Sequence, residues 1–246
     1  MITEVSNAGT DKVNSSVSYT LPSQVETLFL TGTLAINGVG NDLANLLQGN
    51  AAAGVDTLTG GLGDDAYIVE NAGDVVTEQF NEGIDRVSSS VSYILPVNVE
   101  TLTLTGNATI SATGNDLNNS ITGNTAANFI DGGAGHDVLN GGSGIDYFQF
   151  RVTGHVDTIT DFSVADDTIK LDKKVFSVFT NPLPCPIAPG QFITGTQALD
   201  ANDFIVYDKT TGAVFYDADG NGAGEAVQFI NVTPGLALTN GDFHVI

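Results

Sequence analysis

The chain has 246 residues, of which 29 are Asp or Glu and 7 are Lys or Arg, so its formal net charge is −22. This charge excludes proteins that bind nucleic-acid backbones or anionic membranes, and the single cysteine, Cys185, excludes an intramolecular disulfide or a cysteine-clustered metal site. Hydrophobic residues make up 41% of the chain, enough for a folded core, so the unpaired acids indicate bound cations rather than disorder.

The first residues, Met1 to Val5, show no basic segment followed by an apolar stretch. No window of the sequence approaches the roughly 18 apolar residues of a membrane span. We therefore expect no transmembrane segment and an export signal elsewhere in the chain. Met1 falls within a repeat, which indicates a fragment of a longer protein; a short free-standing protein is the alternative.

The sequence contains an internal duplication, in which similar segments recur with an offset of 74 residues. Thr3-Glu4 recurs as Thr77-Glu78, and Val25-Glu26-Thr27-Leu28 recurs as Val99-Glu100-Thr101-Leu102. An internal repeat of this kind is typical of solenoids and arrays. The duplication predicts two tandem repeat units that together cover residues 1–160.

A nine-residue period runs through the second copy as GNDLNNSIT from 114, GNTAANFID from 123, GGAGHDVLN from 132 and GGSGIDYFQ from 141. Related units, GNDLANLLQ and GGLGDDAYI, begin at 40 and 60 in the first copy. Within the four units of the second copy, the sixth residue carries a side-chain oxygen and the eighth is apolar: Asn119, Asn128, Asp137 and Asp146, and Ile121, Ile130, Leu139 and Phe148. A possible ligand and a core residue thus recur in fixed phase.

A nonapeptide of this form predicts a six-residue turn followed by a three-residue strand whose central side chain points inward. Stacked turns then form two parallel sheets around a thin core, and backbone carbonyls and Asp carboxylates converge between turns. Such oxygen-rich cages suit Ca²⁺, which takes six to eight oxygen ligands. We expect an all-β fold, a parallel β-roll or β-solenoid, that binds several Ca²⁺ ions in order to fold.

The units at 132–140 and 141–149, together with 60–68, resemble the RTX (hemolysin-type) nonapeptides of type I secreted proteins. The resemblance implies that each ion takes oxygens from positions two, four and six of one turn and from positions one, three and six of the turn stacked on it. One implied site comprises Asn115, Leu117 and Asn119 with Gly132, Ala134 and Asp137. The others comprise Asn124, Ala126 and Asn128 with Gly141, Ser143 and Asp146, and Asn41, Leu43 and Asn45 with Gly60, Leu62 and Asp65. The resemblance adds Gly133, Gly135, Gly142, Gly144, Asp157 and Asp161 to the metal-binding set.

The period ends near residue 161, and a Pro-rich linker follows at 181–189. Alternating residues predict a hairpin of strands 203–208 and 213–217 and further strands at 227–230 and 243–246. Phe215 to Gly222 and the terminal Asp242 to Ile246 resemble the C-terminal domain that type I exporters recognise. We therefore expect residues 161–246 to be a β-rich capping and secretion domain.

Other motifs favour structural roles. Asp217-x-Asp219-x-Asn221-Gly222 fits the first half of an EF-hand loop, but Gln228 stands where the loop requires Glu, so a hairpin turn is favoured. The histidines, His136, His155 and His244, lack the spacing of a zinc site. Gly141 to Ile145 fails the G-x-S-x-G pattern of a serine nucleophile. We expect no catalytic residue.

Tyr19 and Tyr93 precede the apolar strands VETLFL and VETLTL, which could line a carbohydrate-binding face; plain core is favoured.

Taken with the composition, the RTX resemblance implies a non-enzymatic, calcium-binding module of a secreted bacterial protein. It would fold on calcium binding outside the cell and serve export, stability or surface attachment, with a type I exporter as its partner. Its location would be extracellular, with attachment to the cell surface or to an extracellular polysaccharide as an alternative. The rival interpretation is an accessory module of a secreted enzyme, such as a protease, lipase or mannuronan epimerase.

Overall fold

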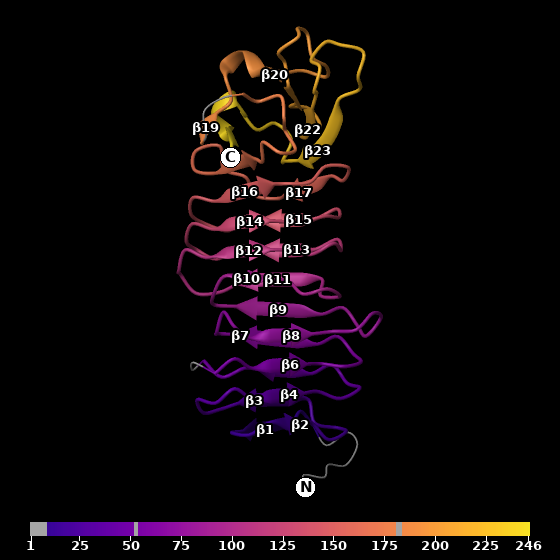
Figure 1. Cartoon of the computed structure of the whole chain (residues 1–246), viewed down its shortest axis with the longest axis vertical. Helices are drawn as coiled ribbons and strands as arrows, with labels where there is room; N and C mark the ends of the chain where they lie inside the picture. Colours follow the sequence, from indigo (N-terminus) through magenta and orange to yellow (C-terminus); the bar gives the residue numbers. More distant parts are fainter. Residues whose placement is uncertain (1–8, 52–53, 181–183) are drawn as a thin grey trace.

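The structure is a computed structural model that describes residues 9–51, 54–180 and 184–246. Thr3-Glu4, with which the first copy of the 74-residue repeat begins, and residues 181–183 of the Pro-rich linker lie outside the described residues. Short strands stack along the longest axis of the molecule, with the first described strands at one end and the C-terminal strands gathered at the other (Figure 1).

Successive strands alternate between two faces of a parallel solenoid. One face stacks, in order, β1 (Lys12–Ser15), β3 (Thr27–Leu30), β5 (Leu46–Gln48), β7 (Ala66–Val69), β9 (Arg86–Ser89), β11 (Thr101–Leu104), β13 (Ser120–Thr122), β15 (Val138–Asn140) and β17 (Asp157–Ile159). The other face is divided into two sheets. The first contains β2 (Tyr19–Thr20), β4 (Asn37–Val39), β6 (Thr57–Thr59) and β8 (Val75–Thr77). The second contains β10 (Tyr93–Ile94), β12 (Ser111–Thr113), β14 (Phe129–Asp131), β16 (Tyr147–Phe150) and β18 (Thr168–Leu171). The prediction of an all-β parallel β-roll is confirmed.

The core is a double column of apolar side chains supplied by most of the short strands. Because side chains alternate along a strand, the central residue of a three-residue strand such as β13 or β15 points inward. In the register of the strands, Leu102, Ile121 and Leu139 lie directly above one another on one face, and Ile130 lies beside Phe148 on the other. All five are fully buried. The eighth position of each nonapeptide therefore builds the core, as the sequence indicates.

The two copies of the 74-residue repeat make the same contacts. The N–H of Asp11 donates to a carboxylate oxygen of Glu26 at 2.9 Å, and the N–H of Asp85 donates to Glu100 at 2.8 Å. In the same way, Ser15 and Ser89 each donate a hydroxyl to a carbonyl oxygen two residues on. Duplicated sequence has thus produced duplicated local structure.

The C-terminal part extends both faces of the solenoid. It contains β19 (Cys185–Pro186), β20 (Phe192–Thr194), β21 (Ile205–Asp208), β22 (Ala213–Tyr216), β23 (Val227–Asn231) and β24 (Phe243–Val245), with two 3-10 turns, η1 (Pro189–Gln191) and η2 (Asn240–Asp242). Strand β23 pairs with β17, and β24 pairs with β18. The predicted hairpin is confirmed, because β21 and β22 pair antiparallel. The boundary at residue 160 stays a prediction.

The loop after Asp217 joins β22 to β23, which also pair antiparallel. The hairpin interpretation of this loop therefore holds. Within the described residues, we find no helix with the length and apolarity needed to cross a membrane.

Candidate metal centre

The sixth residues of stacked turns form ladders of hydrogen bonds. The N–H of Asn119 donates to Oδ1 of Asp137 at 2.7 Å, and the N–H of Asp137 donates to Oδ1 of Asp157 at 3.0 Å. A second ladder links Asn128 to Asp146 at 2.8 Å. Its next step runs from Asp146 to Asp167 at 2.9 Å. One oxygen of each carboxylate is thereby fixed by the backbone of the turn before it.

The first copy contains an equivalent ladder. The N–H of Asn45 donates to Oδ1 of Asp65 at 2.7 Å, and the N–H of Asp65 donates to Oδ1 of Asp85 at 2.8 Å. We call a turn an Asn turn or an Asp turn after its sixth residue. In each of the three predicted gaps, an Asn turn is followed by a Gly-rich Asp turn, and the same geometry arises.

The second carboxylate oxygens are buried. In the described part of the chain, Oδ2 of Asp65 and Oδ2 of Asp137 accept no hydrogen bond. Burial is the main reason why the pKa of each of these two carboxyls is raised to about 7, and it raises the pKa of Asp146 to about 6. Because a buried anionic oxygen without a donor is costly, this arrangement favours a bound cation.

Further oxygens face the same gaps. A Cβ atom at Gly114 would lie 2.1 Å from the carbonyl oxygen of Gly132 and 2.5 Å from Oδ1 of Asn119. A Cβ at Gly123 would likewise lie against the carbonyl oxygen of Gly141 and Oδ1 of Asn128. One at Gly40 would lie against the carbonyl oxygen of Gly60 and Oδ1 of Asn45. A Cβ at Gly132 would itself lie 2.3 Å from Oδ2 of Asp137, so the first position must be glycine for the carboxylate to fold over it.

Carbonyl oxygens of the earlier turns complete the lining. The later turn passes so close that a Cβ at Gly133 would lie 2.5 Å from the carbonyl oxygen of Asn115, and one at Gly135 would lie 2.4 Å from that of Leu117. The equivalent oxygens in the other gaps belong to Asn124 and Ala126, next to Gly142 and Gly144, and to Asn41 and Leu43, next to Gly61 and Gly63. Hard oxygens of this number and kind fit Ca²⁺.

The structure thus brings together the predicted residues at positions two, four and six of the earlier turn with those at positions one and six of the later turn. The third residues, Leu62, Ala134 and Ser143, lie in these later turns. The side chain of Leu62 is exposed. The N–H of Ser143 donates to the carbonyl oxygen of Asn124 at 3.3 Å. The identity of the ligands stays a prediction.

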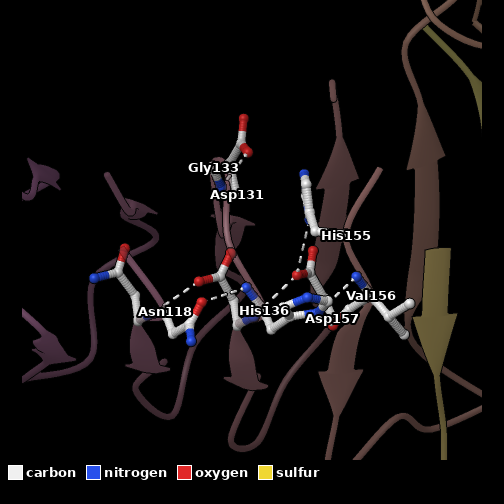
Figure 2. Close-up of polar contacts among 9 residues, drawn as sticks. Asn118, Asp131, Gly133, His136, His155, Val156 and Asp157 are labelled. Carbon is white, nitrogen blue, oxygen red and sulfur yellow. Dashed lines mark hydrogen bonds and ion pairs between the residues drawn. The ribbon is translucent and has the colours of Figure 1, made fainter. Parts of the chain in front are cut away.

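Asp157 and Asp161 take backbone donors. Asp161 accepts the N–H groups of Gly141 and Gly142 through its two carboxylate oxygens, at 2.9 and 2.8 Å. Asp157 accepts the N–H of Asp137 and lies 3.4 Å from Nδ1 of His155 (Figure 2). Both residues therefore hold neighbouring turns in register.

The outer edge of the same turns carries a separate polar ladder (Figure 2). Oδ1 of Asn118 accepts the N–H of His136 at 2.8 Å, and Nδ1 of His136 lies 3.0 Å from the backbone nitrogen of Val156. His136 therefore links adjacent turns, which agrees with the structural role expected for it.

The Asn amides have a role that the repeat pattern did not predict. Nδ2 of Asn115 donates to the carbonyl oxygens of Pro96 and Val99, at 2.6 and 2.8 Å. Asn41 makes the matching bonds to Pro22 and Val25. The signal was present as Gly-Asn-x-x-x-Asn, in which the second-position side chain bonds to the turn before it while its own carbonyl faces the turn after it.

Comparison with known proteins agrees with this geometry. Residues 113–148 match the RTX calcium-binding nonapeptide repeat, in four copies. Two relatives from Rhizobium meliloti (strain 1021) are similar to the chain. Endo-1,3-1,4-beta-glycanase ExsH is 41% identical over 140 residues, covering 57% of this chain and 29% of the relative. Endo-1,3-1,4-beta-glycanase EglC is 38% identical over 162 residues, covering 60% and 34%. The chain thus spans about a third of the length of these relatives.

Proposed function

The chain carries RTX calcium-binding nonapeptide repeats, and we propose that they make it a calcium-dependent β-roll that folds outside the cell. The observation that carries this proposal is the buried carboxylate of Asp137. Its Oδ1 is held by the N–H of Asn119, and among the described residues its Oδ2 has no donor. The carboxylate is thus aimed into a gap that carbonyl oxygens also line.

The proposal follows from the free energy of burial. An ionised carboxylate without a partner costs several kcal/mol to bury, and several such gaps recur along the stack. Bound Ca²⁺ supplies the positive charge and the hard coordination sphere that these oxygens lack. Since binding is confined to the folded state, the chain's stability rises with the calcium concentration.

A calcium titration followed by far-ultraviolet circular dichroism tests this function. In excess chelator we expect a largely unfolded spectrum, and a β-rich one as Ca²⁺ rises through about 0.1 to 1 mM, the range of extracellular modules. Mg²⁺ at the same concentration is the control and should act weakly, because it demands a small, regular octahedron. An unchanged spectrum in chelator would refute the proposal.

We further propose that the chain is a non-catalytic part of a longer, exported enzyme that acts on glycans. The support is the similarity to two relatives named as endo-1,3-1,4-beta-glycanases, of which the chain spans only about a third. Export would follow from a chain that stays unfolded in a calcium-poor cytosol and is handed to a type I exporter through its C-terminal strands. Attachment to a polysaccharide or to the cell surface belongs to the same proposal.

Secretion from cells that carry a type I exporter tests the export role. Deleting residues 203–246 should leave the protein inside the cells. The matched control removes residues 123–140, two nonapeptides that make one full turn of the stack, and should still be secreted. Undiminished secretion of the C-terminal deletion contradicts the export role without touching the calcium proposal.

A further inference from the structure

Three carboxylates converge where the two copies of the repeat meet, and only one of them, Asp65, also belongs to a predicted ligand gap. Asp65 belongs to the first copy, and Glu78 and Asp85 belong to the second. Each offers one oxygen to a group in which all of these atoms lie within 4.8 Å of one another. All three residues are buried, with exposed fractions of 0%, 3% and 1%. Three acids thus share a site from which solvent is excluded.

The place of Glu78 follows from the register of the strands. Thr59 of β6 pairs with Thr77 of β8, so Glu78 stacks on Gly60, the first residue of its nonapeptide. The turn from Glu78 to Asp85 is two residues longer than the turn from Gly60 to Asp65. Glu78 therefore brings a carboxylate to a position where the nonapeptide has only a glycine carbonyl.

The inner oxygen of each acid is held in place. Oδ1 of Asp65 accepts from the N–H of Asn45, and Oδ1 of Asp85 accepts from the N–H of Asp65. The hydroxyl of Tyr67, itself buried, donates to Oε1 of Glu78. The three side chains are thus oriented before any ligand binds.

The outer oxygens are not satisfied by protein groups. Across the described ranges, Oδ2 of Asp65, Oε2 of Glu78 and Oδ2 of Asp85 are buried and have no hydrogen-bond partner. The ion pairs found in the described residues, Arg151 with Asp131 and His155 with Asp157, lie elsewhere. No ion pair found among the described residues therefore involves this cluster of negative charge.

Gly60 makes room for the cluster. A Cβ atom there would lie 2.0 Å from Oδ2 of Asp65 and 2.3 Å from the hydroxyl oxygen of Tyr67. Burial, the largest cause in each case, raises the pKa of Asp65 to about 7, of Glu78 to about 8 and of Asp85 to about 6. A side chain at position 60 would therefore collide with Asp65 and Tyr67.

We propose that Asp65, Glu78 and Asp85 form a calcium site that joins the two copies of the repeat, with Tyr67 as the residue that positions Glu78. The three oxygens lie within 4.8 Å of one another, a spacing that suits the longer bonds of Ca²⁺, about 2.4 Å, better than those of Mg²⁺, about 2.1 Å. Ligand charge sets affinity in calcium sites. With three carboxylates, this site binds Ca²⁺ more tightly than the gaps that pair one Asn with one Asp.

The test uses the full chain, and Ca²⁺ binding is followed by calorimetry and by the metal content after dialysis. Glu78→Gln keeps the size of the side chain and an acceptor for Tyr67 but removes one charge. We expect it to lose one ion per chain, or to weaken the tightest binding step by about tenfold or more. Glu225→Gln, at an exposed position, is the matched control and should bind like the parent chain.

Luminescence of Tb³⁺, an ion that replaces Ca²⁺ and is excited through a nearby tyrosine, locates the site. The first equivalent of Tb³⁺ should emit strongly in the parent chain. Emission should fall in Tyr67→Phe, which removes only a hydroxyl, and in Glu78→Gln, in which the tyrosine is retained. Tyr67→Phe decides the matter if Glu78→Gln fails to fold.

The proposal is overturned if Glu78→Gln binds as many ions as tightly as the parent chain, or if a folded Tyr67→Phe variant emits like the parent. Asp137→Asn separates this outcome from a failure of the proposed function. It should lower the number of weaker ions while the first, tight ion still binds.

Discussion

The turns 114–119 and 132–137 stack on one another but bond to the turn before them by different means. In the first, Nδ2 of Asn115 and Nδ2 of Asn119 both donate to the carbonyl oxygen of Val99, at 2.8 and 3.1 Å. In the second, glycine stands at position two, and the ionised carboxylate of Asp137 cannot donate a hydrogen bond. Side-chain amides thus bridge turn 114–119 to the turn before it, whereas the gap between turns 114–119 and 132–137 requires a cation.

This difference separates two contributions to stability. The hydrogen bonds that the Asn side-chain amides donate form at any ion concentration, because donor and acceptor both belong to the chain. A carboxylate that faces carbonyl oxygens is repelled unless a cation lies between them. We infer that the Asn turns limit how many ions the roll needs, and that the Asp turns make its folding depend on calcium.

Removing the carboxylate from an Asp turn should have the largest effect. Asp137→Ala takes away a calcium ligand and leaves the N–H of Asn119 without its acceptor, so we expect about 4 kcal/mol less stability in saturating calcium. Asp116→Ala is the control, since Asp116 is exposed, and it should change stability by less than about 0.5 kcal/mol. Urea unfolding measures both, and equal midpoints would show that the assigned phase of the repeat is wrong.

Converting an Asn turn toward an Asp turn should have a smaller effect that depends on calcium. Asn119→Asp replaces the amide donor to Val99 by a negative charge, so we expect a loss of about 2 kcal/mol at subsaturating calcium. Saturating calcium should restore much of it, because the new carboxylate is a better ligand than an amide. The measurement is urea unfolding at two calcium concentrations. A loss of the same size at both concentrations would argue against the distinction between the two kinds of turn.

The outer ladder should matter least. Asn118→Ala removes the acceptor for the N–H of His136 at an exposed position, where water can replace it. We expect a loss of about 0.5 kcal/mol or less, independent of calcium. Thermal unfolding with and without excess calcium measures this loss. A loss above about 2 kcal/mol would show that the hydrogen bonds at the outer edge of the turns, and not the inner ladders, stabilise the stack most.

The sequence allowed the fold and the phase of the repeat to be predicted because both depend on local periodicity. A residue such as Ile121 or Phe148 recurs every nine positions, and one inward side chain per strand is all that this core requires. The 74-residue offset likewise predicted two tandem repeat units, and the matching contacts of Asp11 and Asp85 agree with that duplication. These features need no knowledge of distant contacts.

Other features could not be predicted in this way. The two extra residues between Glu78 and Asp85 break the nine-residue phase, so only the strand register places Glu78 on Gly60. The side chain of Asn115 was also ambiguous, because the pattern fixes its position but not the direction of its amide. The pairing of β17 with β23 joins residues more than 70 positions apart, where local pattern carries no information.

The pairing of β17 with β23 and of β18 with β24 covers one end of the stack. In a one-dimensional array, each turn is stabilised by its neighbours, so a turn with a neighbour on one side only opens most easily. The C-terminal strands β23 and β24 supply that second neighbour to β17 and β18, the last strands of the roll. Backbone amide protons of β17 and β18 should therefore exchange with solvent as slowly as those of interior turns, and they should exchange much faster once β23 and β24 are deleted.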